Sequence, residues 1–200
     1  METGLADWEH FVNEPLRMPP LVKCALMHYQ FETIHPFLDG NGRLGRLLIV
    51  FFLVSTGELP APLLYVSSYF DRHKIRYYEL LQGVRERGEI QEWLQFFFRA
   101  VGEQSADAIA RSERIIDLTK TYRQRLHGSR SRAHELVDRL AESPYITSAE
   151  TAKLLGVTGQ GANNILDQMA NDGILTPVNR IPGRAKRWVA YEMLEILSAE

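Results

Sequence analysis

Apolar positions recur every three or four residues through the first two thirds of the chain, a period that predicts amphipathic helices. Residues 5–126 follow this pattern almost throughout. Pro19-Pro20 opens one predicted helix, PLVKCALMHYQFETI, because proline suits the first turn of a helix. A second predicted helix begins near Arg43 and ends at residues 55–57, STG. The pattern therefore predicts a mainly α fold.

The same period continues after a proline-rich stretch. Residues 57–70, GELPAPLLYVSSYF, are interpreted as a connection between helices. Residues 73–88 and 89–126 predict two further amphipathic helices, the second of them broken near Gly102. No internal repeat is present in the sequence.

The pattern changes at residues 127–132, HGSRSR, which are short, polar and basic and are interpreted as a linker. Beyond it, one helix is followed by a helix-turn-helix pattern, in which Ser148 caps AETAKLL and Thr158 or Gly159 opens the next helix. ILTPVNRIPGRAKRWVAY then predicts two strands around a Gly-Arg turn, and YEMLEIL a last helix. We therefore expect a domain at 1–126, a linker at 127–132 and a winged-helix domain at 133–200.

Composition narrows the class of protein. The chain is 45% hydrophobic and 24% charged, as in ordinary globular proteins, and its net charge of −2 gives no overall attraction to nucleic acid or membrane. The single cysteine, Cys24, cannot form an internal disulfide and is expected in the core. No signal peptide is recognisable, and LLIVFFLVSTG is about half the ~20 residues that cross a membrane. These features predict a cytoplasmic protein with no membrane partner.

One loop concentrates reactive and flexible residues: HPFLDGNGRLGR, residues 35–46. A glycine-flanked turn that leads into a helix presents several backbone N–H groups to one point, which suits a phosphate. Gly40 and Gly42 would let the backbone approach a diphosphate, and Asn41 would donate from its side-chain amide. The loop thus predicts a site for a phosphate chain.

The charged and titratable residues of the loop indicate which reaction the site could catalyse. Arg43 and Arg46 share a helix face and can both reach phosphate oxygens. Asp39 offers a hard oxygen ligand for Mg²⁺ shared with the substrate, and His35 can take up a proton near neutral pH. A base, a metal ligand and a phosphate cradle together indicate attack by a hydroxyl on phosphorus.

The loop matches, position for position, the motif HPFxxGNGRxxR of the Fic domain family. FETIHPF, PLLYVSSYF, RYYELL and EWLQFFF also resemble Fic proteins that carry a C-terminal winged helix. The resemblance covers most of the chain and implies a Fic-type helical bundle followed by a small winged helix-turn-helix domain. It implies transfer of AMP from ATP to a Ser, Thr or Tyr hydroxyl of a protein, with release of pyrophosphate.

Carried onto this sequence, the resemblance implies a role for each residue of the motif. His35 would be the base, Phe37 would pack into the core and Asp39 would bind Mg²⁺ between the α- and β-phosphates. Gly40, Asn41 and Gly42 would form the anion-binding nest, and Arg43 and Arg46 would contact the β- and γ-phosphates.

Two comparisons within the resemblance bear on the reaction. Position 42 is Gly, whereas the kinase-like Doc relatives carry Lys there, which favours nucleotidyl over phosphoryl transfer. Tyr77, Tyr78 and Leu81 fall where relatives line the adenine pocket, although either tyrosine could equally belong to the core. Arg85 stands where some relatives place an asparagine, so nucleotide preference stays open.

Two elements of the family have no counterpart in this sequence. About 34 residues precede His35, and they read as the helix and turn that follow the β-hairpin flap of Fic domains. No segment matches the inhibitory pattern [ST]xxxE[GN]. We expect nucleotide binding to survive this departure better than protein modification.

The predicted winged helix leaves two functions open. Its recognition helix offers amide side chains that can hydrogen-bond base edges, and its wing offers cations for phosphates. The candidate DNA-binding residues are Gln160, Asn163, Asn164, Arg184, Lys186 and Arg187. The other interpretation is a module for dimerisation or partner docking.

The sequence thus supports three hypotheses. The leading one is a Mg²⁺-ATP-dependent protein adenylyltransferase that acts on a hydroxyl side chain of a protein target or of itself, with homodimers as in many relatives. The second is a DNA-binding regulator whose Fic part only binds nucleotide. The third is a Fic toxin, or a Fic enzyme that transfers UMP or phosphocholine from another nucleotide donor.

Overall fold

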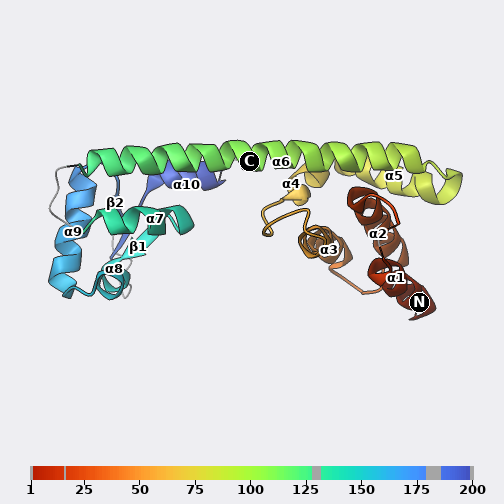
Figure 1. The fold of residues 1–200 in the computed structure, drawn as a ribbon, viewed down its shortest axis with the longest axis horizontal. Coiled ribbons are helices and arrows are strands. Elements are labelled where there is room, and N and C mark those ends of the chain that lie inside the picture. Colours follow the sequence, from red (N-terminus) through yellow and green to blue (C-terminus); the bar gives the residue numbers. More distant parts are fainter. Residues whose placement is uncertain (1, 16, 128–131, 179–185, 199–200) are drawn as a thin grey trace. The chain divides into compact units, whose positions relative to one another are not determined.

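The computed structural model describes residues 2–15, 17–127, 132–178 and 186–198. The fold is mainly α, as predicted, and divides into two compact units, Met1–Ala108 and Ile109–Glu200 (Figure 1). Each unit has a hydrophobic core of its own.

The first unit consists of helices. They are α1 (Glu2–Asn13), α2 (Pro20–Ile34), α3 (Asn41–Ser55), α4 (Val66–Arg72), α5 (Lys74–Arg87) and the first half of α6 (Ile90–Arg125). Pro19 caps α2 and Pro20 is its first residue, as the sequence predicts. The glycine expected to end α5, Gly88, adopts the left-handed conformation at φ 70°.

The core of the first unit is rich in aromatic rings. Phe70, Tyr77, Trp93 and Phe97 are all buried and their rings pack against one another. The indole Nε1 of Trp93 donates to the carbonyl of Ala25 at 3.0 Å, which ties α6 to α2. Cys24 and Ala25 are completely buried in the same cluster, so the core position expected for Cys24 is confirmed.

Two predictions about helices in this region were wrong. The proline-rich connection contains α4, whose Val66, Tyr69 and Phe70 reach the core. The last long helix, α6, continues unbroken through Gly102. Burial of apolar side chains of α6 on either side of Gly102 stabilises the helix by more than the cost of one glycine, about 1 kcal/mol.

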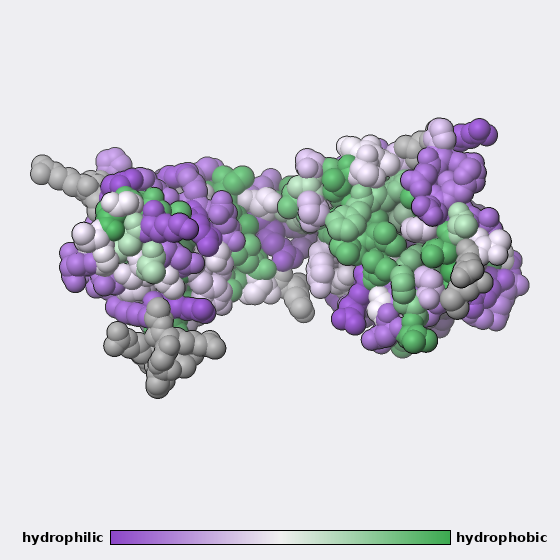
Figure 2. Space-filling model, turned by 90° about the horizontal axis from the view of Figure 1, so that it is seen from below, coloured by the Kyte–Doolittle hydropathy of each residue, from purple (hydrophilic) through white to green (hydrophobic). Residues whose placement is uncertain are grey.

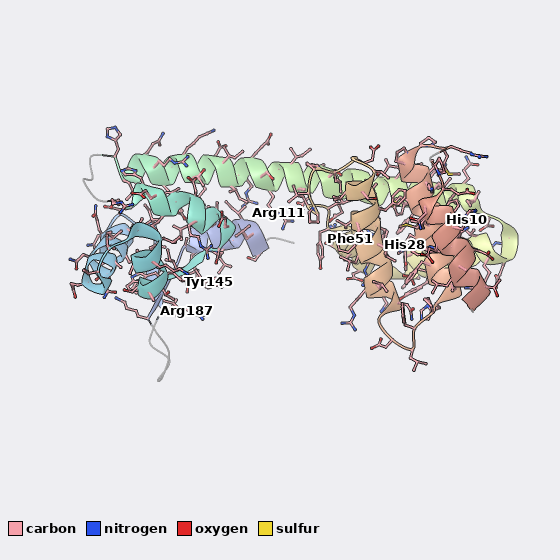
Figure 3. The ribbon with its side chains drawn as sticks, turned by 60° about the horizontal axis from the view of Figure 1, so that its bottom comes forward. His10, His28, Phe51, Arg111, Tyr145 and Arg187 are labelled. Carbon is pink, nitrogen blue, oxygen red and sulfur yellow. The ribbon has the colours of Figure 1, made fainter. Side chains whose placement is uncertain are left out.

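Helix α3 also exposes apolar side chains. Leu47 and Phe51 lie one turn apart on it, 46% and 54% exposed. Phe51 is labelled in Figure 3, and Figure 2 shows apolar residues gathered on the surface of this unit. One side of α3 therefore supports the core while another carries apolar surface.

The second unit contains the end of α6 and a small sheet. Its helices are α7 (His134–Glu142), α8 (Ser148–Leu155), α9 (Gly159–Asn171) and α10 (Tyr191–Ser198). The strands β1 (Tyr145–Thr147), β2 (Thr176–Val178) and β3 (Arg187–Val189) form an antiparallel sheet in the order β1-β3-β2. The two strands expected on either side of the Gly-Arg turn are β2 and β3, whereas β1 was not anticipated.

The boundary between the units differs from the predicted linker. It falls between Ala108 and Ile109, within α6, because Tyr122 and Leu126 are buried in the core of the second unit. Most of the expected linker, 128–131, and the expected wing turn, 179–185, lie outside the described residues. The winged-helix designation therefore stays a prediction.

Among the described residues, no helix combines the length and the apolar character that a membrane crossing requires.

Candidate active site

The motif loop joins the end of α2 to the start of α3. His35 caps α2 in the left-handed conformation, at φ 49° and ψ 58°, and its N–H donates to the carbonyl of Phe31 at 3.0 Å. Gly40 then caps α3 at φ 83°, a conformation that glycine adopts without steric cost. Six residues, 35–40, therefore join the two helices, and His35 is exposed among them.

Asn41 braces this loop from within. Its side chain is almost fully buried, its Oδ1 accepts from the N–H of Phe37 at 2.9 Å and its Nδ2 donates to the carbonyl of Phe37 at 2.6 Å. Both ends of the amide therefore bond the loop backbone, and the donation expected from this amide to a phosphate stays a prediction. Asn41 thus fixes the backbone of the loop at Phe37, beside the predicted nest of N–H groups.

The aromatic ring of the motif does not pack as expected. Phe37 is 50% exposed and Leu38 is fully exposed, so neither side chain contributes to the core of the first unit. The backbone of Phe37, held by Asn41, is what fixes the loop. The half-exposed ring therefore adds apolar surface to the loop.

Asp39 and Arg43 face solvent. Their side chains are 94% and 79% exposed, and Nη2 of Arg43 lies 3.9 Å from Oδ2 of Asp39. Oδ1 of Asp39 accepts the N–H of Gly40 at 2.6 Å, which orients the carboxylate. No group of three potential metal ligands occurs within the described ranges. A single carboxylate fits Mg²⁺, which is commonly held by one or two carboxylates together with substrate phosphates.

Arg46 lies deeper than Arg43. It is half-buried, and its Nε donates to Oγ of Ser67 in α4 at 3.1 Å. A β-carbon at position 42 would lie 3.2 Å from Nη1 of Arg46, so Gly42 leaves room for the guanidinium beside the first turn of α3. The arginine thus has a protein partner that the motif itself does not contain.

Glu32 and Gly45 were missed at the sequence level. The carboxylate of Glu32, on α2, points into α3, where a β-carbon at position 45 would lie 2.5 Å from its Oε1. Burial raises the pKa of Glu32, and the charges of His35 and Arg46 act in the opposite direction. The available signal in the sequence was that Glu32 lies only three residues before His35, in the last turn of α2.

A cleft of about 670 Å³ opens beside the loop. His35 lines it together with residues of α2 and α5, which are Glu32, Thr33, Tyr78, Glu79, Leu81, Gln82 and Arg85. Tyr78 is 55% exposed and Leu81 is half-buried, so both present apolar surface to this space. Nη2 of Arg85 lies 3.4 Å from the carbonyl of Thr33 and spans the two helices.

Tyr77 lies in the core and not in the cleft, which corrects its predicted role. It is 3% exposed, and its hydroxyl lies 2.9 Å from Nε2 of the fully buried His28. Burial lowers the pKa of His28 from 6.5 to about 4, so this imidazole is neutral near neutral pH. Of the two candidate tyrosines, only Tyr78 is placed to meet a ligand.

Of the candidate DNA-binding residues, Gln160, Asn163 and Asn164 lie on α9, Arg187 lies on β3, and Lys186 directly precedes that strand. Gln160 and Asn164 are exposed and bonded to each other at 3.0 Å, and Asn163 is half-buried. Nζ of Lys186 forms an ion pair with Asp167 at 3.2 Å and lies over the ring of Trp188. Both contacts engage the ammonium group within the protein. Arg187 is exposed on β3 (Figure 3), and Arg184 lies outside the described residues.

Comparison with known proteins relates the chain to the Fic family. Residues 1–53 match the Fic/DOC family. The chain is 36% identical over 112 residues to the protein adenylyltransferase Fic of Nematostella vectensis, which covers 56% of this chain and 24% of that protein. It is 37% identical over 94 residues to the protein of that name from Culex quinquefasciatus, covering 46% and 17%.

The chain thus spans about a quarter or less of these curated relatives. Among solved structures, it is similar to a Fic family protein from Desulfovibrio desulfuricans G20, with a TM-score of 0.52 and 22% sequence identity over 94% of this chain and 54% of the other. At this identity the similarity concerns the fold.

Proposed function

We propose that this chain is a Fic-type protein adenylyltransferase, which transfers AMP from Mg²⁺-ATP to a Ser, Thr or Tyr hydroxyl of a protein target or of itself. The observation that carries the proposal is the placement of His35. Its exposed imidazole lines a cleft of about 670 Å³, and the loop that follows leads directly into the glycine-rich start of α3. The match of residues 1–53 to the Fic/DOC family supports the same reaction.

The chemistry follows from this placement. The target hydroxyl would attack the α-phosphorus of ATP, a P–O bond would form, and the bond to the β-phosphate would break with release of pyrophosphate. His35 would accept the hydroxyl proton, since it is the exposed imidazole at the cleft. Arg46 and the N–H groups at the start of α3 would hold the phosphates, with Arg43 at the exposed side. Mg²⁺ held by Asp39 would neutralise phosphate charge.

The base of the nucleotide would lie against α5. Tyr78 and Leu81 offer apolar contact in the cleft. Arg85 lines the same cleft and brings a positive charge to it. A second candidate function is therefore transfer from a donor other than ATP. Incubation with ATP, UTP or CDP-choline, followed by mass analysis, separates these donors by the mass added.

Intact-mass spectrometry of the purified chain with Mg²⁺ and ATP tests the main proposal. We expect a gain of one AMP, on the chain itself or on a protein from an added extract, and no gain with His35→Ala. His10→Ala serves as the matched control, because it removes an exposed histidine of α1 that does not line the cleft. Tight ATP binding without any transfer to protein would contradict the transferase and leave the regulator hypothesis.

For the second unit we propose a module whose polar face binds a partner, with DNA as one candidate. The pairing of Lys186 with Asp167 reduces the positive charge available for phosphates, whereas Arg187 remains exposed. A gel shift at low salt tests DNA binding, which must weaken as salt rises and with Arg187→Ala. A homodimer and a cytoplasmic location are further proposals, checked by analytical ultracentrifugation and cell fractionation.

A further inference from the structure

The phosphate-binding role proposed for Arg46 requires its guanidinium to be held in one orientation. Arg46 has three donor nitrogens, and only Nε has a hydrogen-bond acceptor in the described part of the chain, the hydroxyl oxygen of Ser67 at 3.1 Å. Ser67 belongs to α4, twenty-one residues away in the sequence and outside the motif. With Nε engaged, the two Nη groups are left to bind a ligand.

An alternative partner for this arginine lies close by. Glu32 and Arg46 both approach Gly42, where a β-carbon would lie 3.9 Å from Oε1 of Glu32 and 3.2 Å from Nη1 of Arg46. Oε1 of Glu32 is buried and accepts no hydrogen bond from the described residues. A buried carboxylate oxygen without a partner attracts a mobile guanidinium strongly.

The surroundings offer Arg46 few other anions. Arg46 interacts electrostatically with His28 and Glu32 on α2 and with Tyr77 on α5. The side chains of Glu32 and Arg46 both lie close to Gly42. If the guanidinium of Arg46 lost its bond to Ser67, the carboxylate of Glu32 would therefore be well placed to bind it.

We propose that Ser67 is a positioning residue, whose hydroxyl holds Nε of Arg46 and keeps the guanidinium directed at the phosphates and away from Glu32. This inference rests on the proposed function, because it concerns the arginine assigned to the β- and γ-phosphates. It adds to the site a residue of α4, and it gives the short helix in the proline-rich segment a role in binding.

Calorimetric titration of the full chain with ATP and with AMP tests the inference. We expect Ser67→Ala to weaken ATP binding about tenfold, the effect of losing one hydrogen bond to a charged group. AMP binding should be unchanged, because AMP lacks the phosphates that Arg46 would contact. Ser67→Thr, which keeps the hydroxyl, should restore ATP binding, and Ser68→Ala, on the same helix, should match the wild type.

Two double variants test whether Ser67→Ala weakens ATP binding through Arg46 and Glu32. In an Arg46→Ala background, Ser67→Ala should have no further effect on ATP binding, since the hydroxyl acts through the arginine. In a Glu32→Gln background, Ser67→Ala should cost less than in the wild type, because the competing carboxylate is gone. Equal losses in all backgrounds, or an equal loss of AMP and ATP binding, would overturn the positioning role.

The outcome also separates this inference from the proposed function. If the wild type binds ATP and Ser67→Ala binds it equally well, the positioning role falls and the transferase proposal stands. If the wild type binds neither ATP nor AMP, the proposed function fails and the inference with it. Thermal melts of each variant establish that the altered chains are folded.

Discussion

The carboxylate of Glu32 and the missing side chain of Gly45 share one small space between α2 and α3. A β-carbon at position 45 would lie 2.5 Å from Oε1 of Glu32 and 3.2 Å from both His28 and Phe31. Atoms this close must move apart, and the carboxylate is the most mobile of them. Gly45 is therefore required by its neighbours on α2 and not by its own backbone.

Replacing this glycine tests the argument. We expect Gly45→Ala to lower the free energy of unfolding by about 1–3 kcal/mol, the usual cost of overpacking, and to weaken ATP binding by displacing Glu32 toward Arg46. Chemical denaturation measures the first effect. Gly102→Ala is the matched control: a β-carbon there meets open space, so the helix should gain up to about 1 kcal/mol. Equal effects at both positions would refute the steric explanation.

The buried amide of Asn41 gives a second prediction at this scale. Asn41→Ala removes both hydrogen bonds to Phe37 and leaves two backbone groups unpaired, at a cost of about 1–3 kcal/mol. Because the loop then loses its shape, ATP binding should fall as well, which calorimetry measures. Asn13→Ala, an exposed asparagine bonded only to Glu9, should change neither quantity.

At the scale of elements, helix ends decide the details of the second unit. The residue that caps α8 is Thr147, one position before the predicted Ser148. Oγ1 of Thr147 accepts the N–H of Glu150 at 3.2 Å, and the Glu150 carboxylate accepts the N–H of Thr147 at 2.8 Å. This reciprocal arrangement is a capping box. The sequence TSAE contains it, but the register becomes clear only when the strand before it is known.

The two candidate caps can be told apart by substitution. Thr147→Ala should destabilise the second unit by about 1 kcal/mol, the usual value of an N-cap, as judged by its thermal unfolding. Ser148→Ala should cost less, because that hydroxyl donates a long bond, 3.3 Å, to the carbonyl of Gly159. The reverse order of effects would mean that Ser148 is the cap.

At the scale of the whole molecule, stability should depend on pH through a buried histidine in the first unit. His28 is fully buried, and burial lowers its pKa from 6.5 to about 4. Between these values the unfolded chain binds a proton that the folded chain excludes, so stability is complete above pH 6.5 and is lost as the pH falls toward 4. The loss amounts to about 3 kcal/mol.

Urea denaturation across this pH range measures the effect. In His28→Gln, most of the dependence of the free energy of unfolding on pH should disappear. The urea midpoint of this variant at neutral pH will also fall, because the contact with Tyr77 is altered. His10→Gln is the control, since His10 lies on the surface and pairs with the exposed Glu14. A wild-type slope that survives in His28→Gln would assign the pH dependence to other groups.

The sequence by itself determined the helical class, the limits of α2 and α5, and the loop from His35 to Arg46. These follow from local causes: the period of apolar residues, Pro20 at a helix start, Gly88 at a helix end and the glycines around Asn41. It could not determine which faces of the helices meet.

Only the tertiary structure decided which residues share the candidate site. It brought Ser67 to Arg46, placed Glu32 against Gly45 and moved Tyr77 into the core while Tyr78 stayed in the cleft. Neighbouring tyrosines on one helix carry the same local signal, and only packing against other helices distinguishes them. The continuity of α6 through Gly102 has the same origin, because buried contacts on both sides outweigh a local preference.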